Sequence, residues 1–288
     1  MSGQRTVITA VTTPFHPSGD LDLAATRELY GFVRSTTGQL LVGGTTGEFP
    51  ALSTGERLQL LEIALETLGD QNVINHVGAA DARTAALLTR ASVRAGARRL
   101  AALTPYYLPA TPDELHAYFG SIREAAGDAE LYAYLFPERS GLDVPPELCA
   151  ELARAHGIAG VKLSGSASRQ VREHVAAGPD GFEVYSGNDR ELADVLAAGG
   201  AGVVSGCAAG LPEAFLDLLE ALRTGNTGTG PAQDRVDRVV AALGPSIGRI
   251  KCAQRLRGLP AGGSRMAVAD PDAAAEAIIA ELVRESAS

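Results

Sequence analysis

Eight short apolar runs, separated by segments with helical patterning, constrain the fold of this chain more than any other feature. Several runs are apolar at nearly every position, which is typical of parallel strands covered on both faces. Eight strands, each followed by a helix, predict an α/β fold of the (β/α)8 TIM barrel type. A doubly wound open sheet is the competing fold, but no glycine-rich dinucleotide fingerprint follows the first run. The expected strands are 7–11, 40–43, 73–77, 100–103, 131–135, 159–163, 182–185 and 202–205.

Helix-start signals support this alternation. Ser53 is followed three residues later by Glu56, and Thr111 by Glu114, so each pair forms a capping box. A periodic apolar pattern between Leu23 and Val33 predicts a further helix.

The composition changes after residue 222. Residues 224–230 (TGNTGTG) resemble a flexible linker, and helical patterns follow at 232–243, 247–256 and 271–284. We therefore predict a catalytic barrel over residues 1–224 and a C-terminal helical extension over residues 225–288. No chemistry is evident in the extension.

Composition and charge exclude several classes of function. The 288 residues carry a formal net charge of −9, which disfavours nucleic acid and anionic membranes as partners. No run approaches the roughly 18 apolar residues of a membrane span, and the N-terminus lacks the pattern of a signal peptide. The three cysteines are far apart, which favours a reducing compartment and a cytoplasmic location. The histidines are dispersed, so we expect neither a metal nor another cofactor.

Lys162 is the most informative reactive residue. The chain has only two lysines, Lys162 and Lys251, and the first lies inside the apolar run IAGVKLSG. Burial disfavours a charged amine and favours the nucleophilic neutral form that a Schiff-base lysine requires. The alternative is a lysine at a strand end that reaches solvent or pairs with a carboxylate.

Other candidate residues fall where the predicted strands end, which is the working face of such a barrel. Thr45 and Thr46 lie on the glycine-flanked turn GGTTGE, where hydroxyl and N–H groups could hold a carboxylate or simply cap the next helix. Gly187 follows the seventh strand, and Val204 lies in the glycine-rich eighth strand.

Tyrosines and one arginine add further candidates. Tyr107 follows the fourth strand, while Tyr132 and Tyr134 share one face of the fifth. A tyrosine hydroxyl in the barrel mouth can relay protons, or it can be a core residue with a satisfied hydroxyl. Arg139 could hold a substrate carboxylate, although a surface position is the ordinary expectation for an arginine.

The segments GGTTGEFPALSTGER, TPYY, YLFPERSG and GVKLSG occur in this order. Together they resemble the dihydrodipicolinate synthase/N-acetylneuraminate lyase superfamily of class I, pyruvate-dependent aldolases. The resemblance covers nearly the whole chain and implies a Schiff-base lyase that works as a homodimer or homotetramer.

The resemblance also implies roles. Lys162 would form an imine with pyruvate or another 2-keto acid, and Tyr134 would shuttle protons. Thr46 would link Tyr134 to Tyr107, which the family typically supplies across a dimer interface. The substrate-binding residues would be Thr45, Thr46, Arg139, Val204 and Gly187.

The aldehyde acceptor is less clearly indicated. Arg139 resembles the residue that binds aspartate semialdehyde in the synthases, so 4-hydroxy-tetrahydrodipicolinate synthase-like condensation is the main hypothesis. Leu108 and Leu135 stand where those synthases commonly have Asn, and Leu163 where they have Glu. The alternatives are an aldolase for 2-keto-3-deoxy sugar acids or 4-hydroxy-2-oxoglutarate, and a non-catalytic barrel that binds a keto acid.

Overall fold

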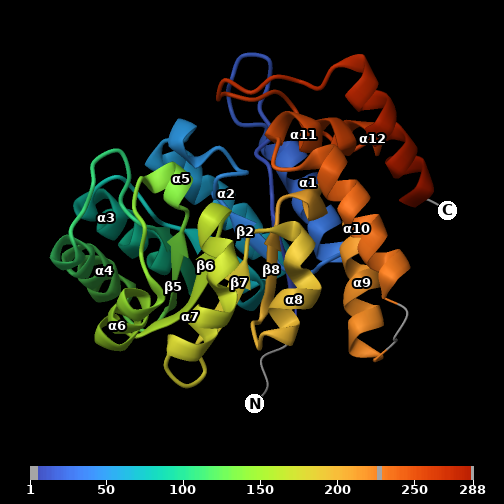
Figure 1. Ribbon diagram of the computed structural model, residues 1–288. Helices are drawn as coiled ribbons and strands as arrows, with labels where there is room; N and C mark the ends of the chain where they lie inside the picture. Colours follow the sequence, from blue (N-terminus) through green and yellow to red (C-terminus); the bar gives the residue numbers. More distant parts are fainter. Residues whose placement is uncertain (1–5, 226–228, 287–288) are drawn as a thin grey trace. The chain divides into compact units, whose positions relative to one another are not determined.

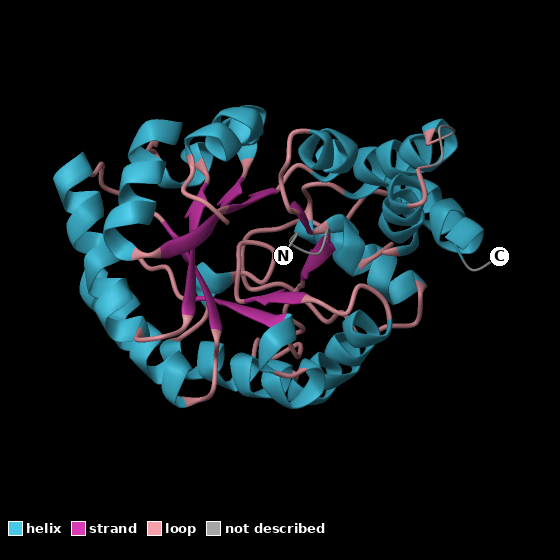
Figure 2. Cartoon of the chain, turned by 90° about the horizontal axis from the view of Figure 1, so that it is seen from below, coloured by secondary structure: helices cyan, strands magenta, loops and turns pink. Residues whose placement is uncertain are grey.

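Eight parallel strands close into a barrel in chain order in the computed structural model, which describes residues 6–225 and 229–286. Helices lie on the outer side of the strands (Figure 2). The predicted (β/α)8 barrel is confirmed. The strands are β1 Thr6–Ala10, β2 Leu40–Val42, β3 Val73–His76, β4 Arg99–Leu103, β5 Glu130–Leu135, β6 Ile158–Leu163, β7 Glu183–Ser186 and β8 Gly202–Ser205.

Each strand lies within two residues of its predicted bounds. The reason is that these strands are covered on both faces: every residue of β1, β2, β3 and β8 is buried. Burial on both faces favours a mostly apolar run, which a sequence displays directly, and the buried polar exceptions include Asn75 and His76 of β3.

The chain packs as two compact units. The first is built from Thr6 and residues 73–204, and it contains most of the strands, from β3 onward. Its α3 and α4 lie side by side (Figure 1). Its helices are α3 Ala82–Arg94, α4 Pro112–Ala126, α5 Pro137–Ser140, α6 Pro146–His156, α7 Val171–Ala177 and α8 Leu192–Ala197.

The second unit combines residues 7–72 with the described residues after 204. In it β1 and β2 pair in parallel, with Thr9 opposite Leu40, and α9 packs against α10. Its helices are α1 Leu23–Ser35, α2 Thr54–Leu68, α9 Glu213–Arg223, α10 Gly230–Leu243, α11 Ile247–Leu256 and α12 Ala273–Ser286. Short 3-10 helices in the two units occupy Phe49–Ala51, Asp70–Asn72, Gly165–Gln170, Asp189–Glu191 and Cys207–Ala209.

The three predicted C-terminal helices are confirmed as α10, α11 and α12. The predicted division at residue 224 stays a prediction, and residues 226–228 of the predicted linker lie outside the described residues. The C-terminal helices share their compact unit with residues 7–72, which include the turn after β2.

Both predicted capping boxes are present. Ser53 accepts a hydrogen bond from the Glu56 amide while the Glu56 carboxylate accepts one from the Ser53 amide, and Thr111 and Glu114 do the same. The three cysteines are buried and unbonded to one another. Within residues 6–225 and 229–286, the structure contains no helix with the length and apolar character of a membrane span.

Glu56 also binds the C-terminal segment. Its carboxylate lies 2.5 Å from the guanidinium of Arg265, and this hydrogen bond lowers the pKa of Glu56 from 4.5 to about 2. A carboxyl group with a lowered pKa in the folded state stabilises that state above its unfolded pKa.

We therefore predict that the contribution of Glu56 is complete above about pH 4.5 and is lost as the pH falls towards 2. Urea unfolding measured from about pH 6 down to about pH 3 covers most of this range and measures the effect. Glu56→Gln should be less stable than the wild type at the upper end, and the difference should shrink on acidification. A difference that stays constant across the range would contradict this assignment.

Candidate active site

Lys162 is buried beside Tyr134. The two residues are opposite each other in the parallel register of β5 and β6, so their side chains project to the same side of the sheet. Lys162 is 8% exposed and Tyr134 is 1% exposed, and Nζ of Lys162 lies 4.3 Å from the centroid of the tyrosine ring. The structure thus places an amine and a phenol in one buried layer, near the carboxyl ends of adjacent strands.

Arg139 extends this group through Phe136. The Phe136 ring is 6.2 Å from the Tyr134 ring, centroid to centroid, and the guanidinium carbon of Arg139 lies 5.6 Å from the centroid of Phe136. Arg139 is exposed, on the short helix α5 that directly follows β5. Phe136 is not among the predicted site residues, although it lies two residues after Tyr134 in the segment YLFPERSG.

Gly187 leaves no space for a side chain beside Lys162. A Cβ atom at this position would lie 2.1 Å from Oγ of Ser164 and 3.2 Å from Cε of Lys162. The amide of Gly187 donates to the carbonyl of Leu163, at 2.6 Å. A glycine is therefore required for the turn after β7 to approach β6 this closely.

Tyr132 contacts residues at the amino ends of the strands, whereas Lys162 and Tyr134 lie near the carboxyl ends. Its hydroxyl donates to Glu183 at 2.8 Å, and the guanidinium carbon of Arg99 lies 5.4 Å from its ring centroid. Arg99 and Glu183 are the first residues of β4 and β7. Two residues along a strand correspond to about 6.6 Å, which separates Tyr132 from the layer of Lys162. The shared parity of Tyr132 and Tyr134 was therefore insufficient to place both in one site.

His76 has structural contacts beside Tyr134. It is fully buried, its Nε2 accepts a hydrogen bond from the Leu103 amide at 3.2 Å, and its ring meets Tyr134 edge to face. No group of three or more His, Cys, Asp or Glu side chains in the described part of the chain is arranged to hold a metal ion.

Thr45 and Thr46 belong to the second unit, at the carboxyl end of β2. Both are half-buried, and the carbonyl of Thr45 accepts a hydrogen bond from the Glu48 amide at 3.1 Å. A Cβ at Gly206 would lie 3.2 Å from Oγ1 of Thr46, so this hydroxyl packs against the backbone just after β8. Val204 is buried within β8, in the first unit.

Tyr107 differs from the other candidates in its exposure. It is 92% exposed, and its φ of 81° lies in the left-handed region that non-glycine residues rarely adopt. Leu108 beside it is 69% exposed. The structure of one chain therefore does not bring Tyr107 into a buried site.

The two lysines have different surroundings. Nζ of Lys251 donates to the carboxylate of Glu48 and to the carbonyls of Thr13 and Gly263, which accounts for all three of its N–H groups. Lys162 instead faces the ring of a tyrosine. Lys162 is consequently the better candidate for a nucleophile.

Comparison with known proteins agrees with the fold and the motifs. A sequence profile of the dihydrodipicolinate synthetase family matches residues 4–275. The chain belongs to this family. The family prediction made from the four segments is therefore confirmed.

Individual relatives match over almost their full length. The 4-hydroxy-tetrahydrodipicolinate synthase of Symbiobacterium thermophilum is 30% identical over 287 residues, which cover 97% of each chain. A dihydrodipicolinate synthase of Cyanidioschyzon merolae, solved with lysine bound, has 26% identity and a TM-score of 0.89 over 99% of this chain and 98% of its own. The synthase of Thermotoga maritima has 27% identity and a TM-score of 0.89 over 99% of both chains.

A monomeric dihydrodipicolinate synthase variant is also similar, with 27% identity and a TM-score of 0.89 over 99% of this chain and 97% of that one. These relatives support the synthase hypothesis over its two alternatives. The roles of individual residues stay predictions.

Gly187→Ala tests the close packing around Lys162. The added methyl group should displace Ser164 and Lys162 and lower the free energy of unfolding by about 1–3 kcal/mol. Gly55→Ala is the matched control, because a Cβ there meets nothing within 4 Å and should raise stability by about 0.5–1 kcal/mol in a helix. Urea unfolding measures both. Equal stabilities for the two variants would contradict the described contact.

Proposed function

We propose that this protein is a pyruvate-dependent lyase of the 4-hydroxy-tetrahydrodipicolinate synthase type. It would condense pyruvate with aspartate semialdehyde through an imine on Lys162. The observation that carries this proposal is the buried Lys162 amine against the Tyr134 ring, in a family whose relatives bear this synthase name over their whole length.

The chemistry begins with addition of the Lys162 amine to the keto carbon of pyruvate. Loss of water leaves a protonated imine, which withdraws electrons from the neighbouring methyl carbon. Removal of a proton from that carbon gives an enamine, and the enamine carbon forms the new bond to the aldehyde carbon. The C=O π bond of the aldehyde breaks, its oxygen takes up a proton, and hydrolysis of the re-formed imine frees Lys162. Tyr134 would carry the protons, because its ring adjoins the amine whose carbinolamine must lose its hydroxyl, from the former keto carbon, as water.

The remaining site residues would bind the substrates. Thr45 and Thr46 would hold the pyruvate carboxylate, with Val204 beside it, and Gly187 would leave room for Lys162. Arg139 would hold the carboxylate of the acceptor. Its guanidinium rests on Phe136, whose ring adjoins Tyr134, which supports an acceptor site next to the proton-transferring residue.

Reduction with borohydride in the presence of pyruvate tests the imine. We expect mass spectrometry to find one reduced pyruvyl group per chain, with peptide mapping to Lys162. Lys162→Ala should form no adduct, although it keeps Lys251, the other of the two lysines. An adduct on another residue, or none, would contradict the proposed mechanism.

Turnover assays test the acceptor. Aspartate semialdehyde with pyruvate should be consumed by the wild type. Tyr134→Phe should slow this reaction about 100-fold or more, because a positioned proton-transfer group contributes that much. Release of pyruvate from 4-hydroxy-2-oxoglutarate or a 2-keto-3-deoxy sugar acid, without condensation, would replace the synthase assignment with an aldolase.

Arg139→Ala should separate the two substrates. Loss of a charge-assisted hydrogen bond to the acceptor carboxylate should raise the KM for aspartate semialdehyde about tenfold or more. The KM for pyruvate should stay within about twofold, since Arg139 would not contact it. Steady-state kinetics with each substrate varied in turn gives both values, and an equal change in both would exclude this role.

We further propose that the protein is a homodimer or homotetramer in which Tyr107 completes the site of a partner subunit. Its exposure and left-handed φ support a role outside its own chain. Thr46 would connect this Tyr107 to Tyr134. The monomeric variant among the relatives makes the oligomeric state a question for measurement.

Mixing two inactive variants tests the shared site. Tyr107→Phe and Lys162→Ala subunits, unfolded together and refolded in equal amounts, should recover about a quarter of the wild-type activity in a dimer. Half of the dimers would be mixed, and each mixed dimer would contain one intact site. Recovery no greater than the sum of the separate variants would show that each chain uses its own Tyr107.

We also propose a cytoplasmic location. Three buried, unbonded cysteines suit a reducing compartment.

A further inference from the structure

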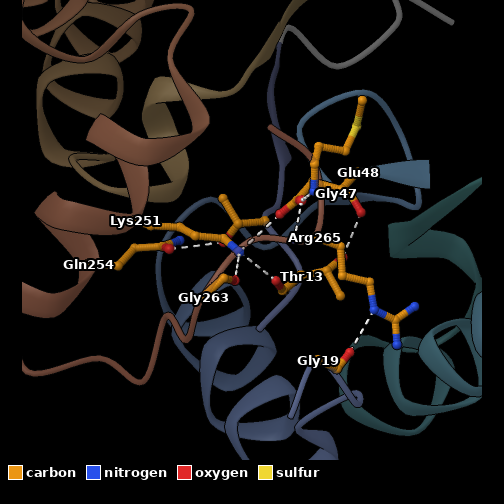
Figure 3. A network of polar contacts seen from close by, with 10 residues as sticks. Thr13, Gly19, Gly47, Glu48, Lys251, Gln254, Gly263 and Arg265 are labelled. Carbon is orange, nitrogen blue, oxygen red and sulfur yellow. Dashed lines mark hydrogen bonds and ion pairs between the residues drawn. The ribbon is translucent and has the colours of Figure 1, made fainter. Parts of the chain in front are cut away.

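Lys251 and Glu48 form an ion pair in the interior of the second unit. Nζ of Lys251 lies 3.0 Å from Oε1 of Glu48, and the side chains are 1% and 0% exposed. The two residues are 203 positions apart in the sequence. Figure 3 shows this pair at the centre of a network of polar contacts. The proposed chemistry uses neither residue.

The Glu48 carboxylate is held on both oxygens. Oε2 accepts hydrogen bonds from the backbone amides of Arg265 and Met266, at 2.9 and 2.8 Å. Oε1 faces Lys251, whose Nζ also donates to the carbonyl of Thr13 at 2.8 Å and to that of Gly263. Each charge is therefore fully partnered, which is the condition under which a buried pair is tolerated.

The pair fixes the backbone of the turn that carries Thr45 and Thr46. Glu48 has φ 59° and ψ 36°, a left-handed conformation that is costly for a residue other than glycine. Its amide donates to the Thr45 carbonyl at 3.1 Å, and the preceding amide, of Gly47, donates to Gly44 at 3.1 Å. Because the carboxylate is anchored at the same residue, a change in the anchor must be transmitted to this turn.

Further hydrogen bonds tie α11 and the segment around Arg265 to loops of the same unit. Gln254, one turn after Lys251, accepts a hydrogen bond from Thr12 at 2.8 Å and donates to the Ala209 carbonyl at 3.0 Å. The Arg265 side chain donates to the carbonyls of Gly19 and Ala51, at 2.6 and 3.0 Å. Helix α11 and the segment around Arg265 are thus hydrogen-bonded to the loops that follow β1, β2 and β8.

We propose that Glu48 and Lys251 are positioning residues that hold the Thr45–Thr46 turn in the geometry required to bind the carboxylate of the keto acid. The C-terminal region is then part of the active-site apparatus. The identity of the ligand, a keto acid, rests on the proposed function. The role of the ion pair in fixing the turn is independent of that function.

The carboxylate of pyruvate keeps its charge throughout the reaction, so a group that binds it stabilises the ground state and the transition state alike. Loss of such binding raises KM and leaves kcat nearly unchanged. A purely structural pair would behave differently: its loss would lower the melting temperature and the folded fraction, while the folded enzyme would keep its KM.

The test uses Glu48→Gln, which preserves the shape of the side chain, and Lys251→Met, which preserves its unbranched stem. The matched control is Asp270→Asn, which removes the exposed ion pair between Asp270 and Arg255 of the same helix α11. Steady-state kinetics are measured per folded subunit, with pyruvate varied. Hydrogen exchange is followed in parallel for the peptide that covers residues 43–49.

Glu48→Gln and Lys251→Met should each raise the KM for pyruvate about tenfold, with kcat changed less than about threefold. They should accelerate exchange in peptide 43–49 about tenfold or more, and Asp270→Asn should do neither. If both variants keep a KM for pyruvate within about twofold of the wild-type value, the proposal is overturned, whatever their melting temperatures. An equal rise in KM for the control Asp270→Asn also overturns it. If Lys251→Met fails to fold, Glu48→Gln decides.

The two proposals fail in different ways. A wild type that neither turns over nor traps pyruvate removes the proposed function, and exchange in peptide 43–49 then decides whether the pair fixes the turn. Unchanged exchange in Glu48→Gln would overturn the positioning role even in a fully active enzyme.

Discussion

The parallel register between β5 and β6 is the constraint on which the proposed chemistry depends most. It sets Tyr134 opposite Lys162 and brings the amine to 4.3 Å from the ring centroid. Side chains alternate along a strand, so a shift of one residue would turn one member of the pair to the other face. On the other side of β6, Gly187 directly follows β7 and lies close to Ser164 and Lys162. This close approach constrains the position of β7 beside Lys162.

The same unit separates two polar layers by their position along the strands. Lys162 and Tyr134 lie towards the carboxyl ends, whereas Tyr132, Glu183 and Arg99 are linked near the amino ends. Burial raises the pKa of Tyr132, so its hydroxyl stays protonated and serves as a donor to Glu183. The Tyr132 hydroxyl therefore supplies no base to the layer of Lys162 and Tyr134.

The strands and helix caps could be predicted because their signals are local. Strands buried on both faces favour mostly apolar runs, and a capping box spans only four residues, as at Ser53 and Glu56. Lys162 could be selected because lysine is rare here and its segment is apolar. The partners of Tyr132 could not be predicted, because parity gives the face of a strand but not the side chains of Glu183 and Arg99 that it meets on other strands.

Two features of the site depend on contacts that no local pattern encodes. Phe136 lies between Tyr134 and Arg139 because the short helix α5 begins directly after it, at the end of β5. Glu48 and Lys251 meet across 203 positions, and the buried pair was visible in the sequence only as a second isolated lysine. The left-handed conformations of Glu48 and Tyr107 likewise have no signal in residue type, since neither residue is a glycine.

A crystal structure of the protein soaked with pyruvate tests the central claim most directly. We expect a covalent bond between Nζ of Lys162 and the keto carbon, with the Tyr134 hydroxyl beside that carbon and the carboxylate at the Thr45–Thr46 turn. Pyruvate bound at another position, or an unmodified Lys162 at saturating pyruvate, would contradict it.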